Sequence, residues 1–164
     1  MHAARQKGFT EPDPRDDLSG MDVARKLIIL GREMGLALEL RDVHVESLVP
    51  PSLAGGSIEE FMAQLSGHDG QMRARLEAAH ARGKVLRYTG KISAVGEATV
   101  GLQELDRQHP FANIALTDNV VRFVTRRYRD NPLIVQGPGA GPEVTAGGVF
   151  ADLLRLAAYL GARL

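Results

Sequence analysis

"TEPDPRDDLSGMDVARK", residues 10–26, crowds five acidic side chains and three cations into one short stretch of the chain. Prolines at positions 12 and 14 fix the backbone φ at about −65° and bias the residues before them away from helical geometry, so this stretch is stiff. Carboxylates held at fixed angles suit a small cation such as the ammonium group of a substrate. The alternative is a purely structural role, because acidic residues also stabilise a helix N-terminus through the helix dipole.

The next residues predict a helix from about Leu18 to Met34, with Asp16 or Asp17 as its N-cap and Gly35 at its end. Apolar residues recur along it at helical spacing. One face of the helix is therefore expected to pack against a core.

Asp22 and Lys26 lie one turn apart on this helix. If their face is buried, the ammonium group loses hydration and its pKa falls, which suits a general acid or base near neutral pH. Asp22 opposes that fall, because it favours the charged form of Lys26. If the face is exposed, the pair is a surface ion pair worth only about 0.3–0.5 kcal/mol. The spacing alone does not choose between the two.

Strands and helices follow in groups along the rest of the chain. A strand is expected around residues 42–48, a capping-box pattern at Ser57 and Glu60 predicts a helix start, and another helix is expected from about Gln71 to Arg82. Four further strands are predicted at residues 84–92, 99–105, 119–128 and 132–137. A closing helix is predicted at about residues 142–160. Strands grouped between helices favour an α+β fold, a mixed sheet covered by helices.

The composition excludes several classes of function. The 164 residues carry 20 acidic and 20 basic side chains, so charge gives no reason to expect nucleic acid or an anionic membrane as a partner. The chain has no cysteine, which removes disulfides and thiolate chemistry and fits a reducing cytosol. No apolar run approaches the roughly 20 residues that span a bilayer, and "MHAARQKGFT" (1–10) lacks the apolar centre of a signal peptide. We expect a soluble, cytoplasmic protein.

The acidic stretch does not match a calcium-binding EF-hand. With Gly20 in the sixth position of the loop, the first and twelfth ligand positions fall on Arg15 and Lys26, both cations. The five histidines show no metal-ligand spacing. A looser magnesium or calcium site on the carboxylates is an open alternative, but our prediction names no metal ligand.

A glycine-rich turn, "LIVQGPGAGPEVTAGGVF" (133–150), leads from a strand into the closing helix. Glycines at such a turn let backbone N–H groups approach an anion, and the helix dipole helps. A dinucleotide-binding fold needs a second strand with an acid about 20 residues later, and the sequence stops at Leu164. The turn is therefore expected to touch part of a cofactor held elsewhere, or to be simply a tight turn.

Taken together, these stretches resemble one family. "GFTEPDPRDDLSGMDVARKL" (8–27) is similar to the signature of homoserine dehydrogenases, including the dehydrogenase half of bifunctional aspartokinase/homoserine dehydrogenases. The resemblance covers nearly the whole chain in the family's order, at "SLVP" (47–50), "KVLRYTGKI" (84–92), "HPFANI" (109–114), "TDNVV" (117–121) and "QGPGAG…VTAGGVFADLL" (136–154).

The resemblance implies an NAD(P)-dependent oxidoreductase that interconverts L-aspartate 4-semialdehyde and L-homoserine on the way to threonine, methionine and isoleucine. At the matching positions, Lys26 corresponds to the catalytic lysine that handles the proton at the aldehyde or alcohol oxygen. Glu11 and Asp22 match residues that hold the amino-acid substrate, and Asp17 matches an acid that helps arrange the same site. Gly141 matches a glycine that contacts the nicotinamide cofactor.

The resemblance also implies a homodimer paired through the sheet and, in the family, a preceding dinucleotide-binding domain. We therefore expect residues 1–164 to form one substrate-binding, catalytic and dimerisation domain that lacks this Rossmann domain. Such a piece would bind little of the NADP or NAD by itself and have little activity alone. The alternative is a non-catalytic dimerisation or regulatory module that keeps the motif as a structural cap.

Overall fold

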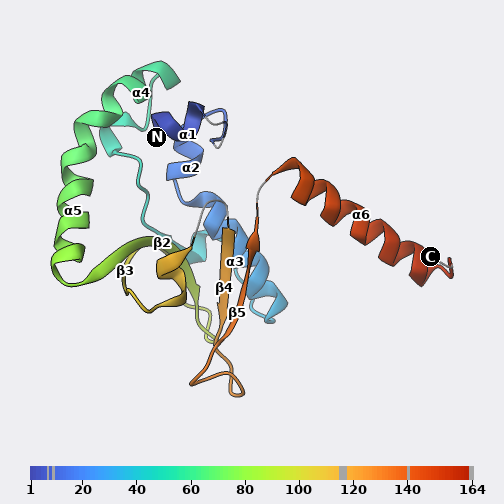
Figure 1. Ribbon diagram of the computed structural model, residues 1–164. Coiled ribbons are helices and arrows are strands. Elements are labelled where there is room, and N and C mark those ends of the chain that lie inside the picture. The colour runs from blue at the N-terminus through green and yellow to red at the C-terminus, as the bar shows by residue number, and fades with distance from the viewer. Residues whose placement is uncertain (7, 9, 115–117, 140, 163–164) are drawn as a thin grey trace. The chain divides into compact units, whose positions relative to one another are not determined.

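The fold is described from a computed structural model that covers residues 1–6, 8, 10–114, 118–139 and 141–162. The chain divides into two compact units, Met1–Arg107 and Gln108–Leu164. Each unit has its own helices and strands (Figure 1).

In its described residues, the first unit combines five α-helices with a three-stranded sheet. Its elements are α1 (His2–Gln6), α2 (Pro14–Leu18), α3 (Met21–Glu33), β1 (Val43–Val45), α4 (Ile58–Leu65), α5 (Asp69–Ala81), β2 (Lys84–Ile92) and β3 (Ala98–Asp106). The strand order is β1-β3-β2, with β1 parallel and β2 antiparallel to β3. The predicted α+β class, a mixed sheet with helices, is confirmed.

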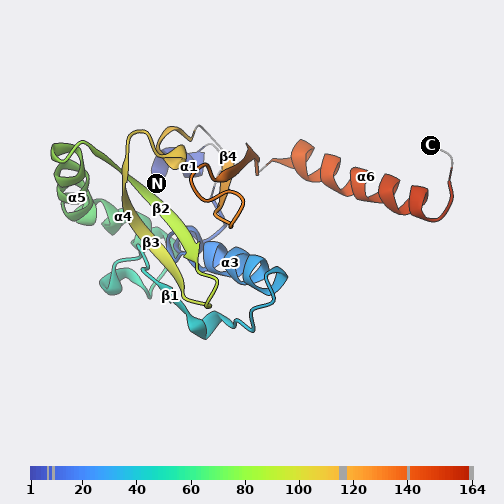
Figure 2. The same cartoon turned by 90° about the horizontal axis from the view of Figure 1, so that it is seen from below.

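Helix α3 packs against this sheet and forms the main core of the unit (Figure 2). The buried residues come from α3 and from two strands: Ala24, Leu27, Ile28, Val43, Ala98 and Val100. A Cβ added at Gly90 on β2 would lie 3.1 Å from Val23 and 3.3 Å from Leu27. The missing side chain lets the helix approach the strand closely, so the start of α3 is held firmly.

The single helix predicted from Leu18 to Met34 is in fact two helices, α2 and α3. Ser19 and Gly20 separate them, and Gly20 adopts φ +77°, a left-handed conformation that ends a helix. The predicted end of the helix was placed correctly, since Gly35 has φ +84° and α3 stops at Glu33.

The predicted N-cap was also wrong. Asp13, not Asp16 or Asp17, caps α2, because its side chain accepts a hydrogen bond from the Arg15 backbone N–H at 2.9 Å. Pro14 occupies the first helical position, where its missing N–H costs nothing. Asp16 and Asp17 therefore lie inside the helix and not at its cap.

The segment around α4 forms a second, smaller core. The predicted capping box at its start is confirmed, with Glu60 N–H donating to Ser57 Oγ at 3.2 Å and Ser57 N–H donating to Glu60 Oε2 at 2.9 Å. Phe61, 1% exposed, packs with Leu53 and Met62. Helix α5 begins two residues before the predicted start at Gln71.

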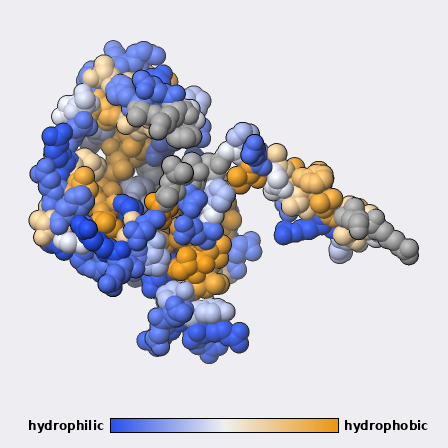
Figure 3. Space-filling model, in the orientation of Figure 1, coloured by the Kyte–Doolittle hydropathy of each residue, from blue (hydrophilic) through white to orange (hydrophobic). Residues whose placement is uncertain are grey.

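The second unit contains a hairpin and a long helix. Strands β4 (Asp118–Phe123) and β5 (Leu133–Pro138) pair antiparallel, and α6 runs from Pro142 to Tyr159. The strand predicted at 119–128 was too long, because β4 ends at Phe123 and residues 124–131 form an exposed connection. Along α6 many large apolar side chains are exposed, as the orange stretch of this helix in Figure 3 shows.

In the described part of the chain, no helix has both the length and the apolar character that crossing a membrane requires.

Candidate functional site

Much of the acidic stretch lines one open cavity of about 650 Å³ in the first unit. The lining residues are Glu11, Asp16, Asp17, Ser19, Met21, Asp22, Arg25 and Lys26. The four site residues that the sequence predicted in this stretch, Glu11, Asp17, Asp22 and Lys26, are thus brought together on one surface.

The break between α2 and α3 creates this arrangement. A Cβ added at Gly20 would lie 1.9 Å from the Tyr88 hydroxyl oxygen, so no other residue fits there without displacing Tyr88. The Tyr88 hydroxyl donates to the backbone carbonyl of Glu46 at 2.7 Å. Burial raises the pKa of Tyr88, and the nearby Glu46 carboxylate adds to the effect. The close approach of Gly20 to the sheet fixes where each helix starts and ends.

Lys26 forms an ion pair with Asp22, with Nζ 2.8 Å from Oδ2. The two side chains are 59% and 65% exposed, so in this chain the pair is the surface pair that the sequence left as one alternative. The burial on which the other alternative depended is not present here. Lys26 therefore offers an ammonium group at the edge of the cavity, within reach of a bound molecule.

Glu11 and Asp17 are connected directly across the loop. The Glu11 backbone N–H donates to Asp17 Oδ2 at 3.0 Å. With Asp16 and Asp22, four carboxylates surround the cavity, and such a concentration of negative charge attracts cations. Among the described residues, no group of three or more acids, histidines or cysteines is arranged to hold a metal ion.

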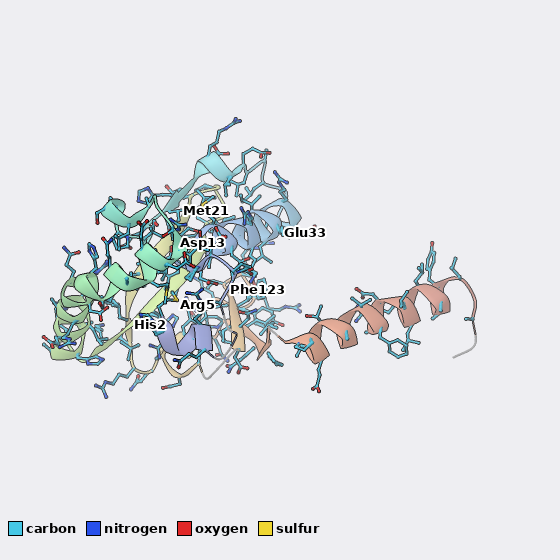
Figure 4. All side chains as sticks on the ribbon, turned by 90° about the horizontal axis from the view of Figure 1, so that it is seen from above. His2, Arg5, Asp13, Met21, Glu33 and Phe123 are labelled. Carbon is cyan, nitrogen blue, oxygen red and sulfur yellow. The ribbon has the colours of Figure 1, made fainter. Side chains whose placement is uncertain are left out.

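Asp13 has a different task from the other four acids. Its carboxylate is paired with Arg15, with Nε donating to Oδ1 at 3.0 Å and Nη2 to Oδ2 at 2.6 Å. This side-chain hydrogen bond holds the pKa of Asp13 below its ordinary value. Figure 4 labels Asp13 and Met21, the residues that flank α2 and the following Ser19 and Gly20. Asp13 is thus occupied within the fold.

Gly141 belongs to the second unit. It precedes α6 with φ +121°, and its carbonyl accepts hydrogen bonds from Thr145 N–H and Oγ1, both at 3.1 Å. A Cβ placed there would meet nothing within 4 Å. The open space leaves room for a ligand, while the positive φ favours glycine.

Four lining residues were not predicted as site residues: Asp16, Ser19, Met21 and Arg25. A signal for Arg25 was present, since it lies three residues after Asp22 and so on the same side of a helix. A second cavity, of about 280 Å³, lies between residues 47–51 and α5 and has no carboxylate in its lining. It offers no comparable set of charged groups.

Known proteins resemble this chain over most of its length. A sequence model of the family described as homoserine dehydrogenase matches residues 1–154. The chain is 57% identical over 162 residues to the chloroplastic bifunctional aspartokinase/homoserine dehydrogenase 2 of Arabidopsis thaliana, covering 97% of this chain and 18% of that protein. It is 52% identical over 161 residues to the homoserine dehydrogenase of Emericella nidulans, covering 93% of this chain and 44% of that protein.

A similar fold occurs in a crystal structure of a Candida auris protein of unknown function, with a TM-score of 0.89 and 44% identity. The match covers 96% of this chain and 44% of that one. The chain thus spans less than half the length of each of these proteins. Because the family model covers almost all of it, the chain belongs to the homoserine dehydrogenase family.

Proposed function

We propose that this chain supplies the substrate site of an NAD(P)-dependent homoserine dehydrogenase, which interconverts L-aspartate 4-semialdehyde and L-homoserine. One observation carries the proposal: Glu11, Asp17, Asp22 and Lys26, all in the stretch that resembles the family signature, line the same cavity. The activity of the whole protein is part of the proposal, because the chain spans 18% and 44% of the two relatives named above.

In the proposal, the acidic side chains bind the substrate. An amino acid carries an ammonium group, and carboxylates in a partly enclosed site attract it strongly. In the proposal Glu11 and Asp22 bind this group. Asp17 arranges the site, since its carboxylate already holds the Glu11 backbone N–H at 3.0 Å.

Lys26 supplies the proton. When an aldehyde is reduced, negative charge builds on its oxygen, and a nearby ammonium group stabilises that charge and protonates the oxygen. In the reverse direction the same nitrogen takes the proton from the alcohol. Asp22, 2.8 Å away, keeps the Lys26 side chain on the cavity side of α3.

A nicotinamide cofactor would supply or accept the hydride. The described residues fit one contact to it: Gly141 has open space beside it and stands before the N-terminus of the long helix α6. A backbone without a side chain lets a flat ring approach closely. In the proposal Gly141 makes this contact, and most of the NADP or NAD is bound by another domain, so this chain has little activity alone.

The remaining parts of the proposal rest on the family resemblance. They are a role in the biosynthesis of threonine, methionine and isoleucine, a homodimer paired through the sheet, and a cytoplasmic location. The lack of cysteine is compatible with a reducing compartment. Cell fractionation and analytical ultracentrifugation test the location and the dimer separately.

A second candidate function is a non-catalytic dimerisation or regulatory module. Two contacts favour it, because Asp13 caps α2 and Asp17 holds the Glu11 N–H, so both acids serve the fold itself. The two candidates differ at Lys26, whose side chain makes no such contact with the backbone.

The proposal is tested by titrating the chain with L-homoserine in isothermal titration calorimetry and NMR. We expect binding that shifts the signals of residues 11–26, and much weaker binding of 4-hydroxybutanoate, which lacks the ammonium group. Glu11→Gln should weaken homoserine binding by roughly tenfold or more, because a charge-assisted hydrogen bond is lost. Glu59→Gln, an exposed acid on α4, is the matched control.

Two results would contradict the proposal. One is homoserine binding that is unchanged in Glu11→Gln. The other is a set of NMR shifts confined to residues outside the cavity. A steady-state assay with homoserine and NADP tests the separate expectation that the chain alone turns over little substrate.

A further inference from the structure

Arg15 differs from Arg25 and Lys26, the other cations of the acidic stretch, because it does not line the cavity. Its guanidinium group is instead held on several sides. Besides the side-chain hydrogen bonds to Asp13, its Nη1 donates to the Gly56 carbonyl at 3.1 Å. The Arg15 Cζ atom lies 5.7 Å from the centre of the Phe61 ring, a cation–π arrangement. The Arg15 side chain is only 19% exposed.

The partners of Arg15 outside the acidic stretch belong to a well-fixed part of the fold. Phe61 is 1% exposed and lies in the core around α4. Gly56 stands directly before Ser57, whose capping box with Glu60 fixes the first turn of α4. Arg15 therefore joins the acidic stretch to a rigid neighbour far along the chain, the separation from Gly56 being 41 residues.

Arg15 lies on helix α2, which would not be rigid by itself. Helix α2 has five residues, and a helix of that length is not stable in water without outside contacts. Asp16 and Asp17 lie on it, and Glu11 is bound to Asp17. The acidic side of the cavity is thus attached to α2.

We infer that Arg15 is a positioning residue for the substrate site: by fastening α2 to Gly56 and Phe61, it holds Glu11, Asp16 and Asp17 where a substrate ammonium group binds. The inference rests on the proposed function. A loop that is ordered beforehand loses less conformational freedom when its ligand binds. Lys26 and Asp22 lie on α3, whereas Arg15 lies on α2. Loss of the Arg15 contacts to Gly56 and Phe61 should therefore weaken substrate binding more than it disturbs proton transfer.

Arg15→Lys is the first test, because lysine keeps the charge but lacks the planar fork that holds Asp13 and the Gly56 carbonyl together. In the 164-residue chain we expect the Kd for homoserine to rise roughly tenfold, and the Glu11 amide to exchange its hydrogen faster. Asp13→Asn should act in the same direction. Arg126→Lys, on the exposed connection of the second unit, is the control and should change neither quantity.

A double-mutant cycle separates positioning from general destabilisation. If Arg15 acts through the acids, Arg15→Lys should weaken binding little further in a chain that already carries Glu11→Gln. Fully additive losses would overturn the inference. If the wild-type chain fails to bind homoserine, the proposed function fails. Hydrogen exchange still tests whether Arg15 holds α2 in place: an unchanged exchange rate of the Glu11 amide in Arg15→Lys would overturn that role.

Discussion

The two units of the chain differ in how they bury apolar surface. The first unit has two cores, one between α3 and the sheet and one around Phe61. In the second unit, Ala112 alone is buried among the described residues, and the exposed large apolar side chains on α6 include Phe150 at 61% and Leu153 at 57%. A helix whose apolar side chains stay exposed gains little stability from packing. The candidate substrate site thus lies in the unit that has the two cores, whereas large apolar side chains of the second unit are exposed.

The largest effect is expected from a change at Lys26, in the candidate site of the first unit. In a fusion of the chain to a dinucleotide-binding domain, Lys26→Ala should lower kcat by on the order of 10²–10⁴-fold, because the proton donor is removed. The free energy of unfolding should change by no more than about 0.5 kcal/mol, since the Asp22 pair is exposed. Steady-state kinetics and urea unfolding measure the two effects. Lys84→Ala, at another ion pair of the first unit, is the control. Unchanged kcat would favour the non-catalytic module.

Gly20→Ala should cause the next largest effect. The left-handed φ of +77° and the clash with the Tyr88 hydroxyl should together destabilise the first unit by about 2–4 kcal/mol. Gly70→Ala on α5 is a matched control, because a Cβ there meets nothing within 4 Å and alanine favours a helix. Chemical denaturation compares the two variants. Equal stability in both would show that the junction of α2 and α3 is not constrained.

The exposed helix α6 should make the chain associate. Light scattering at rising concentration should detect species larger than a monomer, and Phe150→Glu with Leu153→Glu should raise the concentration needed for this association roughly tenfold or more. Arg155→Gln, on the same helix, is the control. A wild-type chain that stays strictly monomeric at high concentration would contradict the expectation that the exposed side chains of α6 cause association.

A smaller effect is expected at low pH, within the first unit. The Arg75 hydrogen bond lowers the pKa of Glu46 from its ordinary 4.5, and the Leu102 N–H adds to the shift. Because the folded pKa is depressed, this contribution to stability is fully present above about pH 4.5 and is lost as the pH falls through the lower folded value. Thermal unfolding from pH 3 to 7 should show a shallower acid decline in Glu46→Gln than in wild type. Arg75→Ala should reduce the decline similarly, and a decline as steep as in wild type in both variants would contradict this assignment.

Much of the fold could be predicted from local pattern. Alternation and turn residues located β2 and β3 closely, and the Ser57–Glu60 box located the start of α4. The errors came where tertiary contact decides. The apolar period runs through Ser19 and Gly20 without a break, although Gly20 must turn there to pass the Tyr88 hydroxyl.

The candidate site was partly predictable for a related reason. Glu11, Asp17, Asp22 and Lys26 are close in sequence, so one stretch could point to them as a group. The different role of Asp13 could not be foreseen, because its partner Arg15 is fixed by Gly56 and Phe61, far along the chain. The five acids look equivalent in the sequence, but only Asp13 pairs with the arginine that lies against the Phe61 ring.

The short elbow at Ser19–Gly20 also sets the angular phase between α2, with Asp16 and Asp17, and α3, with Asp22 and Lys26. Each residue added to a helix rotates the remainder of that helix by about 100°. A one-residue insertion at the elbow would thus turn Asp16 and Asp17 away from Asp22 and Lys26 while every one of these side chains was still present. In this segment the number of residues therefore matters as well as the identity of their side chains.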